Sequence, residues 1–555
     1  MARPEYDTVD QMIRARAGDP NPALLFEEER WSWAEHVRAS AARAALALDL
    51  RREGPFHIGF LLENVPECSF WLGAGAVSGA TMVGINPTRR GAELARDITY
   101  TDCQLIVTES RYADVLHELG LDLERDQRIL VVDTPQYLER LAPYAGASLP
   151  PSTVEPKSTA VLIFTSGTSG APKAVITSHA RWTFIGQMLS LVQNLTAADV
   201  FYEAMPLFHS NALFAGWSPC VYVGGTLALR RKFSASSFLP DIRKFGATYM
   251  NYVGKPLTYI LATPETPDDK NHRLRLVFGN EAAERDIGRF RDRFGVVVQD
   301  AYGSTETGAN VTRPADTPPG ALGRAPDGTV VLDPETLEEK PPACFDAAGR
   351  LLNSEECIGE LVNKNIGAGF EGYYRNDEAN QQRIRHGWYW TGDLAYRDAA
   401  GWFYFAGRDF EWLRVDGENF SAAPLEAILM RFEGVLLCGV YAVPDEDVGD
   451  QVMAILQVSD LDGFDAAALD AFLERQSDLG TKWSPRYIRV AADVPLTSTA
   501  KLLKRQLRAE RWECSDPVWF RSGKGEKLRR LETDDIKALR ARFAERGRLG
   551  ELDKL

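Results

Sequence analysis

A run of hydroxyl-bearing residues, glycines and one lysine has the composition that a phosphate-binding loop needs. The run is Thr165-Ser-Gly-Thr-Ser-Gly-Ala-Pro-Lys173, and it directly follows an apolar stretch of strand length at residues 160–165. Glycines let the backbone turn tightly and bring its N–H groups close to an anion, while the hydroxyls and the lysine add donors and positive charge. The spacing differs from a Walker A loop, because Lys173 comes three residues after Gly170 and is followed by Ala174. We expect a phosphate-binding loop here, against the alternative of a flexible serine-rich surface loop.

Four further short motifs follow this loop along the chain. They are Met205-Pro-Leu-Phe-His209, Ala301-Tyr-Gly-Ser-Thr-Glu306, Trp390-Thr-Gly-Asp393 with Gly407-Arg408, and Pro495-Leu-Thr-Ser-Thr-Ala-Lys501. Each has an ordinary structural interpretation when it is taken alone. An aspartate after a glycine often caps a turn, His209 can be a structural histidine, and Lys501 precedes Lys504 and Arg505 where a solvated helix could begin.

The elements that must position these residues alternate between strand and helix patterns. Apolar runs at 56–62, 104–108 and 128–132 predict buried strands, and residues 66–79, 91–99 and 112–119 have helical patterns. Ser32 and Glu35 have the spacing of a capping box that starts a helix. Strands that alternate with helices predict a parallel sheet covered on both faces.

The pattern changes in the last part of the chain. Residues 320–350 are rich in proline, glycine and acids, which predicts turns and a small β-rich layer. Beyond residue 400, strand patterns at 401–406, 435–443 and 451–458 accompany one helix at 465–475. We therefore predict the α/β class: a large N-terminal domain of doubly wound α/β subdomains plus the small β layer (1–407), and a smaller mobile α+β C-terminal domain (408–555).

Composition and charge exclude several classes of function. The 555 residues contain 63 Lys+Arg and 78 Asp+Glu, a net charge of −15 that argues against nucleic acid as the main partner. The seven cysteines are scattered without a CxxC pair, which favours a reducing compartment over a disulfide framework or a zinc site. The first residues lack a signal-peptide pattern and no apolar stretch reaches spanning length, so we expect a cytoplasmic protein without a transmembrane segment. No repeat indicates an oligomeric state.

The motifs, in this order and spacing, resemble those of the adenylate-forming enzymes, which include acyl-CoA synthetases, aryl-CoA ligases, luciferases and peptide-synthetase adenylation domains. The resemblance covers nearly the whole chain. Other stretches resemble the fatty-acid-transport-protein and very-long-chain acyl-CoA synthetase branch, although we expect no counterpart of the N-terminal membrane segment of its animal members. These stretches are Phe208-His-Ser-Asn-Ala, Arg231-Lys-Phe-Ser-Ala-Ser, Asn251-Tyr-Val-Gly, Val277-Phe-Gly-Asn280 and Val415-Asp-Gly-Glu-Asn419.

The resemblance implies an ATP-dependent acid–CoA ligase. A carboxylic acid attacks the α-phosphate of ATP to form an acyl-AMP, and the thiol of CoA then displaces AMP. Negative charge accumulates in the first step, so catalysis requires positioned cations and hydrogen-bond donors. In this family's pattern Glu306 and Thr168 hold Mg²⁺, Lys501 bridges the carboxylate and phosphate oxygens, and His209 gates the acid pocket.

The resemblance also implies a nucleotide- and CoA-binding set. Its members are Thr165, Ser166, Gly167, Ser169, Gly170, Lys173, Asn280, Tyr302, Gly303, Thr305, Asp393, Arg408 and Gly417. Tyr302 would lie against adenine and Asp393 would accept from the ribose hydroxyls. Rotation of the C-terminal domain near Arg408 would exchange Lys501 for the segment around Gly417, which would open a path for CoA.

Three positions depart from the family pattern, and two alternative functions stay open. Ala174 replaces the usual glycine after the loop lysine, Phe410 occupies a hinge position, and Asn280-Glu281 stands in a variable strip. The first alternative is transfer of the activated acid to an amine, a carrier protein or another acceptor, including nitrite activation for diazotisation of an aromatic amine. The second is a non-catalytic nucleotide-binding or lipid-handling protein. The identity of the acid cannot be read from the sequence.

Overall fold

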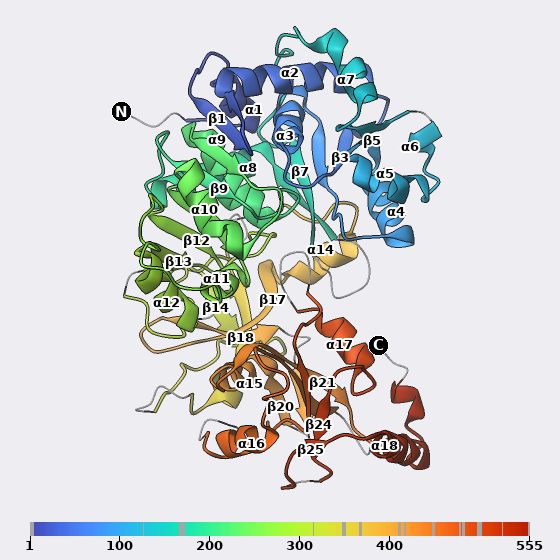
Figure 1. Cartoon of the computed structure of the whole chain (residues 1–555), viewed down its shortest axis with the longest axis vertical. Helices are drawn as coiled ribbons and strands as arrows, with labels where there is room; N and C mark the ends of the chain where they lie inside the picture. The colour runs from blue at the N-terminus through green and yellow to red at the C-terminus, as the bar shows by residue number, and fades with distance from the viewer. Residues whose placement is uncertain are drawn as a thin grey trace. The chain divides into compact units, whose positions relative to one another are not determined.

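The computed structural model describes residues 5–125, 127–165, 173–282, 284–314, 316–346, 351–365, 369–408, 412–415, 418–446, 450–476, 479, 483–496, 502–523 and 525–552. The chain forms two compact units (Figure 1). Unit 1 comprises Met1–Asn310 and Ile366–Arg385, and unit 2 comprises Val311–Asn365 and His386–Leu555.

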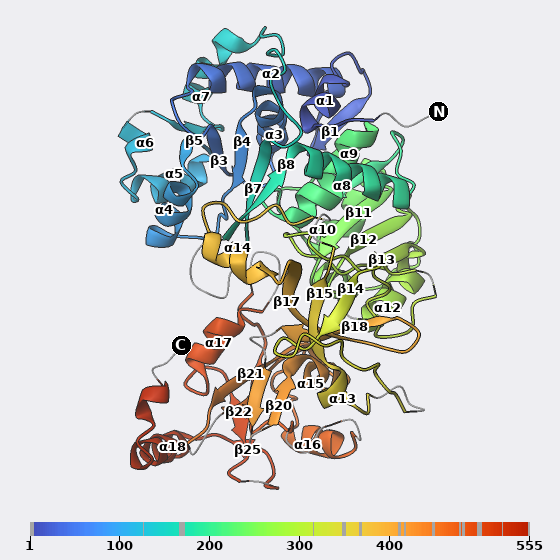
Figure 2. The same cartoon turned by 180° about the vertical axis from the view of Figure 1, so that it is seen from behind.

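One sheet of unit 1 has the order β6-β5-β3-β4-β7-β8 and is parallel except for the β7–β8 hairpin. Its strands are β3 (His57–Leu61), β4 (Thr81–Gly84), β5 (Cys103–Thr108), β6 (Ile129–Val131), β7 (Thr159–Thr165) and β8 (Lys173–Ser178). Figure 2 shows β5, β3, β4 and β7 side by side. All five residues of β3 are buried, which explains why the sequence of this strand shows a continuous apolar run.

Two apolar cores cover the two faces of this sheet. Ile58 and Phe60 of β3 belong to the core that contains α2 (Trp33–Asp49) and α3 (Pro66–Ser78), while Leu61 belongs to a core with α4 (Gly91–Tyr100) and α5 (Ser110–His117). Successive strand residues point to opposite faces, so one apolar run contributes to both cores. The Ser32–Glu35 capping box is present at the start of α2, and α3 ends at Gly79, which has a φ of 74°.

The second sheet of unit 1 has the order β13-β12-β11-β9-β10-β1-β2, and β2 alone is antiparallel to its neighbour. Its strands are β1 (Pro22–Phe26), β2 (Glu29–Ser32), β9 (Val200–Glu203), β10 (Thr226–Leu229), β11 (Tyr249–Val253), β12 (Leu276–Asn280) and β13 (Val297–Asp300). Helix α8 (His179–Val192) follows β8, and a π-helix, η2 (Ala212–Trp217), leads into α9 (Ser218–Val223). The carboxyl ends of the parallel strands, where ligands bind in open α/β sheets, carry the predicted motifs.

Unit 2 contains a small antiparallel sheet and a larger C-terminal sheet. The small sheet pairs β14 (Thr329–Leu332), β15 (Gly359–Asn363), β17 (Trp388–Arg397) and β18 (Phe403–Arg408). The C-terminal sheet has the order β21-β22-β23-β24-β25. Its strands are β21 (Val435–Pro444), β22 (Asp450–Val458), β23 (Tyr487–Ala491), β24 (Val518–Phe520) and β25 (Arg529–Arg530).

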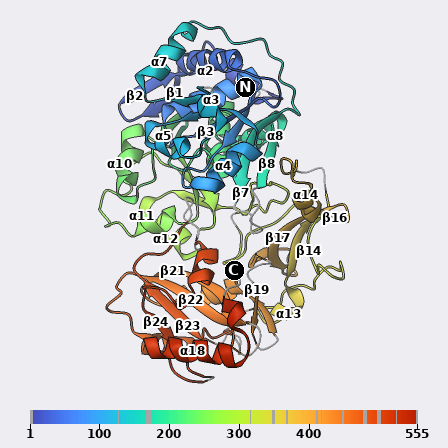
Figure 3. The same cartoon turned by 90° about the vertical axis from the view of Figure 1, so that its right-hand side faces the viewer.

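Helices cover both faces of the C-terminal sheet, and Figure 3 shows β21 to β24 with α18 next to them. Val440 and Ala442 of β21 pack in a core with α15 (Ala422–Leu429) and α16 (Ala466–Glu474). Tyr441 and Val443 pack on the other face with α17 (Lys504–Glu510) and α18 (Thr533–Glu545). The predicted α/β class and α+β C-terminal region are confirmed, while the boundary at residue 407 stays a prediction. No helix in the described ranges is both long and apolar enough to cross a membrane.

Candidate active site

The β7–β8 hairpin places the two ends of the predicted phosphate loop opposite each other. Thr165 pairs with Lys173 in the ladder, and the Lys173 side chain is buried. Ser166, Gly167, Thr168, Ser169 and Gly170 lie outside the described residues. Ala174 is also buried in β8 and has no positive φ, so glycine is not required at this position.

A distant segment, residues 369–375, runs alongside β8. Ile176 N donates to Gly372 O at 2.9 Å and Tyr374 N donates to Ala174 O at 2.8 Å. The Glu371 carboxylate accepts from both N and Oγ of Ser178, the N-cap of α8. These bonds fix the segment against the strand that begins with Lys173.

Tyr373 of this segment joins two predicted site residues. Its hydroxyl donates to Glu306 Oε1 at 2.8 Å and accepts from Arg383 Nε at 3.1 Å. The Lys173 ammonium lies 5.8 Å from the centroid of the Tyr373 ring. Both Tyr373 and Glu306 are buried, so the cluster holds a carboxylate, a phenol and two cations in a poorly solvated place.

The electrostatics of this cluster suit anionic ligands. Burial lowers the pKa of the Lys173 ammonium, and the positive charge of Arg383 acts in the same direction. Burial also raises the pKa of Tyr373, with a further contribution from the Glu306 charge. Tyr373 therefore keeps its proton and donates to Glu306, while the crowded cations favour the approach of negative charge.

The donor chemistry of Glu306 fits a magnesium ion that is shared with a nucleotide. No group of three or more His, Cys, Asp or Glu side chains within the described ranges could hold a metal by itself. Mg²⁺ is commonly held by one or two carboxylates while phosphates and water supply the other ligands. A single carboxylate beside a phosphate loop matches that arrangement.

The segment that contains His209 is fixed by polar contacts from two other parts of the chain. Ser210 Oγ lies 2.7 Å from Thr305 Oγ1, which links it to the motif that ends in Glu306. Asn64, after β3, donates to Met205 O at 2.8 Å and accepts from Leu207 N at 2.9 Å. His209 itself is half-buried, with its ring 6.3 Å from that of Phe208.

The ends of β12 and β13 position the start of the 301–306 motif. Ala301 N donates to Gly279 O at 2.8 Å, and the Asn280 side-chain amide donates to Ala301 O. Tyr302 is half-buried and Gly303 is exposed. Asn280 therefore holds the backbone of the residue that precedes Tyr302.

In unit 2, Asp393 and Arg408 are directly opposite each other in the β17–β18 ladder. Asp393 is buried, and its N–H donates to Thr391 Oγ1 at 3.0 Å, while the Thr391 hydroxyl donates to Leu361 O at 2.7 Å. Gly392 between them has a φ of 70°, a value that favours glycine. Lys501, Gly417 and Phe410 lie outside the described residues.

The sequence analysis missed three residues near the predicted motifs: Asn64 and Tyr373 bond to motif residues, and Arg383 donates to Tyr373. Asn64 is followed by Val65-Pro66 and reads as a turn residue, and Tyr373 lies 67 residues beyond Glu306. Only the pairing of residues 369–375 with β8 brings Tyr373 to this place.

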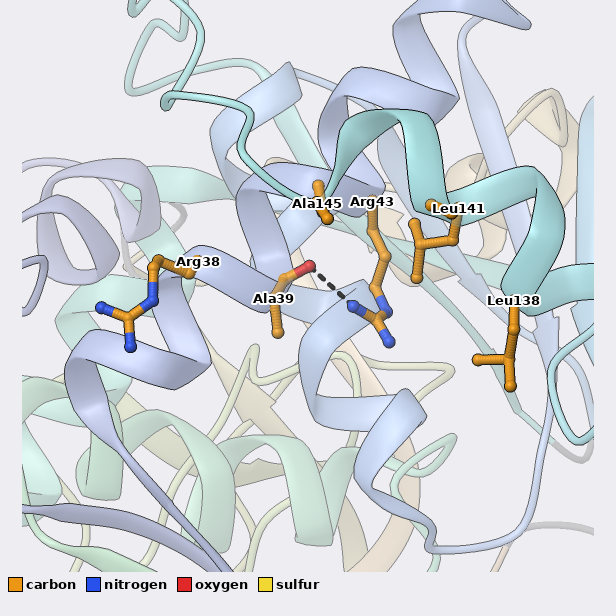
Figure 4. A pocket seen from close by; sticks show the side chains of 8 residues that line it. Arg38, Ala39, Arg43, Leu138, Leu141 and Ala145 are labelled. Atoms are coloured by element: carbon orange, nitrogen blue, oxygen red, sulfur yellow. Dashed lines mark hydrogen bonds between the residues drawn. The ribbon is translucent and has the colours of Figure 1, made fainter.

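A surface groove on unit 1 lies apart from these residues (Figure 4). It is formed by α2, α7 (Pro135–Leu141) and the turn after α7. The one guanidinium in its wall that is buried, that of Arg43, donates to Ala39 O at 2.8 Å and pairs with both oxygens of Glu67. The Arg43 guanidinium is therefore already hydrogen-bonded to other residues of the protein. The groove contains none of the predicted site residues.

The paired ends of the predicted phosphate loop, the Glu306–Tyr373–Lys173 cluster and the strand-end motifs fit an α/β enzyme that binds a nucleotide. Sequence comparison identifies it further: the AMP-binding enzyme model matches residues 13–374, and the AMP-binding enzyme C-terminal domain model matches residues 424–501. The chain belongs to the AMP-binding enzyme family, within the adenylate-forming superfamily.

Named relatives place the chain among CoA-ligase-like members. It is 49% identical to the steroid-22-oyl-CoA synthetase of Rhodococcus jostii (strain RHA1), over 96% of this chain and 97% of that protein. It is 47% identical to the medium/long-chain-fatty-acid–CoA ligase FadD17 of Mycobacterium tuberculosis, over 93% and 99%. Long-chain fatty acid transport protein 5 of Mus musculus is 30% identical over 86% and 73%, which supports the predicted branch.

Solved structures share the fold. The anthranilate CoA ligase AuaEII in complex with anthranoyl-AMP has a TM-score of 0.79 and 20% identity, covering 91% of this chain and 97% of that chain. ATP-bound MatB from Rhodopseudomonas palustris has a TM-score of 0.77 and 23% identity, covering 90% and 98%.

Proposed function

We propose that the chain is an ATP-dependent acid–CoA ligase that activates a carboxylic acid as an acyl-AMP and transfers the acyl group to CoA. The observation that carries this proposal is the 49% identity to steroid-22-oyl-CoA synthetase over nearly the full length of both proteins. The predicted phosphate loop and Glu306, which this reaction would use, are present in the sequence.

In this mechanism the residues of unit 1 bind and orient ATP. The loop at residues 165–173 would hold the phosphates through its backbone N–H groups, with Lys173 adding charge at the start of β8. Glu306 and Thr168 would hold Mg²⁺, which when bound neutralises phosphate charge. Thr305, fixed by Ser210, would donate to the α-phosphate, and Tyr373 would keep Glu306 in one orientation.

The other predicted residues complete the site in the proposal. Asp393 would accept from the ribose hydroxyls and Arg408, opposite it in the ladder, would act at the domain hinge. Lys501 would bridge the acid and the α-phosphate during adenylation, and the backbone around Gly417 would approach CoA in the second step. His209 would gate the acid pocket.

We further propose that the acid is largely apolar, either an acid on a steroid side chain or a medium- to long-chain fatty acid. The support is the printed activity of the relatives at 49% and 47% identity. A cytoplasmic location and the absence of a nucleic-acid partner remain predictions from composition and charge.

A mass-spectrometric assay tests the function. Purified protein is given ATP, Mg²⁺ and a panel of steroid side-chain, fatty and aromatic acids, each with and without CoA, and AMP, acyl-AMP and acyl-CoA are measured. We expect acyl-CoA from one apolar class and no adenylate from Lys501→Ala. Adenylate that never becomes a thioester would overturn CoA as the acceptor, and absence of adenylate with every acid would overturn the proposal.

A further inference from the structure

A carboxyl group lies buried in unit 1, and no cation of the described residues is paired with it. Glu203 is the last residue of β9 and is 0% exposed. Its Oε1 accepts from Met205 N at 3.0 Å and from Asn251 Nδ2 at 3.1 Å. Only these two hydrogen bonds favour the charged form, and no basic side chain of the described part of the chain acts on it. An ionised carboxylate in such a place is costly.

The second carboxyl oxygen of Glu203 and the side-chain oxygen of Asn251 are both acceptors that lack a donor in the part of the chain that the structure describes. Neither Glu203 Oε2 nor Asn251 Oδ1 has a hydrogen-bond partner within the described residues. Both face the same point on η2, because a Cβ at Gly216 would lie 1.6 Å from Glu203 Oε2 and 3.2 Å from Asn251 Oδ1. Two acceptor oxygens that face one point repel each other unless a proton lies between them.

Turning the Asn251 amide over does not remove the mismatch. In the present orientation Asn251 Nδ2 donates both to Glu203 Oε1 and to Asn211 Oδ1, the latter at 2.9 Å. The reversed amide would set its oxygen against these two acceptors. Of these two side chains, the carboxyl group is therefore the one that can supply the proton.

We propose that Glu203 is held as the neutral carboxylic acid and forms a cyclic acid–amide pair with Asn251, and that this pair positions the segment that contains His209. The Oε2 hydroxyl donates to Asn251 Oδ1 while Asn251 Nδ2 donates to Glu203 Oε1. One proton thereby satisfies both orphaned oxygens.

The surroundings of Glu203 agree with a neutral group. Burial raises the pKa of Glu203 well above its ordinary value, against the opposing effect of its two hydrogen bonds. The titratable groups on which a Glu203 charge would act are Cys68 of α3, Cys220 of α9 and Tyr249 of β11. Burial raises the pKa of each of these three groups too, and none supplies a positive charge that could compensate an ionised Glu203.

The pair fixes both ends of one functional segment. Glu203 holds the backbone N–H of Met205, and Asn251 holds the side chain of Asn211, whose Nδ2 donates to Tyr252 O at 2.9 Å. His209 lies between these anchors. The adjoining π-helix brings Gly216 against the pair, and such helices are frequent at functional sites.

Infrared difference spectroscopy on the full-length chain tests the neutral acid directly. At about pH 8 we expect a carboxylic-acid C=O band in the wild type that is lost in Glu203→Gln. Burial raises the pKa of Asp97 only to about 6, so Asp97 is ionised under these conditions. The matched control is Glu109→Gln, because Glu109 is also buried but is paired with Arg231; this variant should keep the band. A band that is absent from the wild type, or unchanged in Glu203→Gln, would overturn the proposal.

Kinetics test the positioning role, and this arm rests on the proposed function whereas the infrared arm does not. In the wild type, ionisation of Glu203 at alkaline pH should break the pair and raise KM for the acid. In Glu203→Gln the new amide can still donate to Asn251 Oδ1 and does not ionise, so KM for the acid should stay close to the wild-type value at neutral pH and should not rise at alkaline pH. Glu203→Met removes the pair at similar volume and should raise KM for the acid about 10-fold, the loss expected for one to two hydrogen bonds, with KM for ATP unchanged. Equal KM values for the acid in Glu203→Met and the wild type would overturn the positioning role.

Discussion

Replacing Tyr373 with phenylalanine would remove one oxygen atom from the cluster around Glu306 and leave the surrounding backbone in place. The ring of Tyr373 is 1% exposed and packs with Val175 and Ala379. Phenylalanine fills the same space, so the change isolates the hydroxyl. What is lost is the bond to Glu306 Oε1 at 2.8 Å and the acceptor for Arg383 at 3.1 Å.

The size of the effect follows from the charge of the acceptor. A hydrogen bond to a charged group contributes about 1.5–3 kcal/mol, which corresponds to roughly a 10- to 150-fold change in rate or affinity. Glu306 is 8% exposed, so little water can replace the lost donor. Without it the carboxylate can rotate away from the position in which it would bind Mg²⁺. We therefore expect kcat/KM for adenylation to fall within this range, with a higher Mg²⁺ concentration for half-maximal activity.

The assay is ATP–pyrophosphate exchange in the absence of CoA, with Mg²⁺ as the varied component. Tyr374→Phe is the matched control, because it makes the same change in the neighbouring residue of the same segment. Tyr374 donates to Asp102 Oδ2 at 2.7 Å and has no bond to Glu306. We expect its exchange rate and Mg²⁺ dependence to match those of the wild type.

Two results would refute the reasoning. Exchange by Tyr373→Phe at the wild-type rate and Mg²⁺ dependence would show that Glu306 does not need this donor. Equal losses in the Tyr373 and Tyr374 variants would show that the hydroxyls only hold residues 369–375 in place.

Three other predictions follow from the described contacts. Asn64→Ala leaves two buried backbone groups of residues 205–207 unpaired, so urea unfolding should show a loss of about 2–4 kcal/mol; a loss below about 0.5 kcal/mol would contradict this. Burial lowers the pKa of His36 to about 3 and of His179 to about 4. The unfolded chain thus binds more protons below about pH 6.5, and each histidine should lower stability by about 1.4 kcal/mol per pH unit on acidification; His36→Gln should reduce that slope in urea titrations. Asp393→Ala should weaken ATP binding in calorimetry about 10-fold if it accepts from the ribose hydroxyls, and unchanged binding would refute that role.

Much of the fold was predictable because its signals are local. Residues 57–61 form one apolar run because alternate side chains enter two different cores, and the run itself identifies a doubly covered strand. The capping box at Ser32 and the proline at the start of α3 are likewise short-range patterns. Each of these depends on residues within one or two turns of one another.

The contacts within the candidate site were not predictable for the opposite reason. Tyr373 reaches Glu306 across 67 residues, and Asn64 reaches residues 205–207 across more than 140. Neither Asn64 nor Tyr373 has a local pattern that distinguishes it from a turn or core residue. The protonation state of Glu203 could not be predicted from the sequence either. It depends on the groups that surround the carboxyl group in space, and not on the residues next to Glu203 in the sequence.

The pairing of residues 369–375 with β8 has a consequence for biosynthesis. Strand β8 lies at the edge of its sheet, and its partner leaves the ribosome about 200 residues later, roughly 10–40 s at usual translation rates. During that interval the nascent chain exposes an unpaired edge, which is a common starting point for aggregation. Expression yield should therefore depend on translation speed between these two segments and on chaperones that shield the edge until its partner arrives.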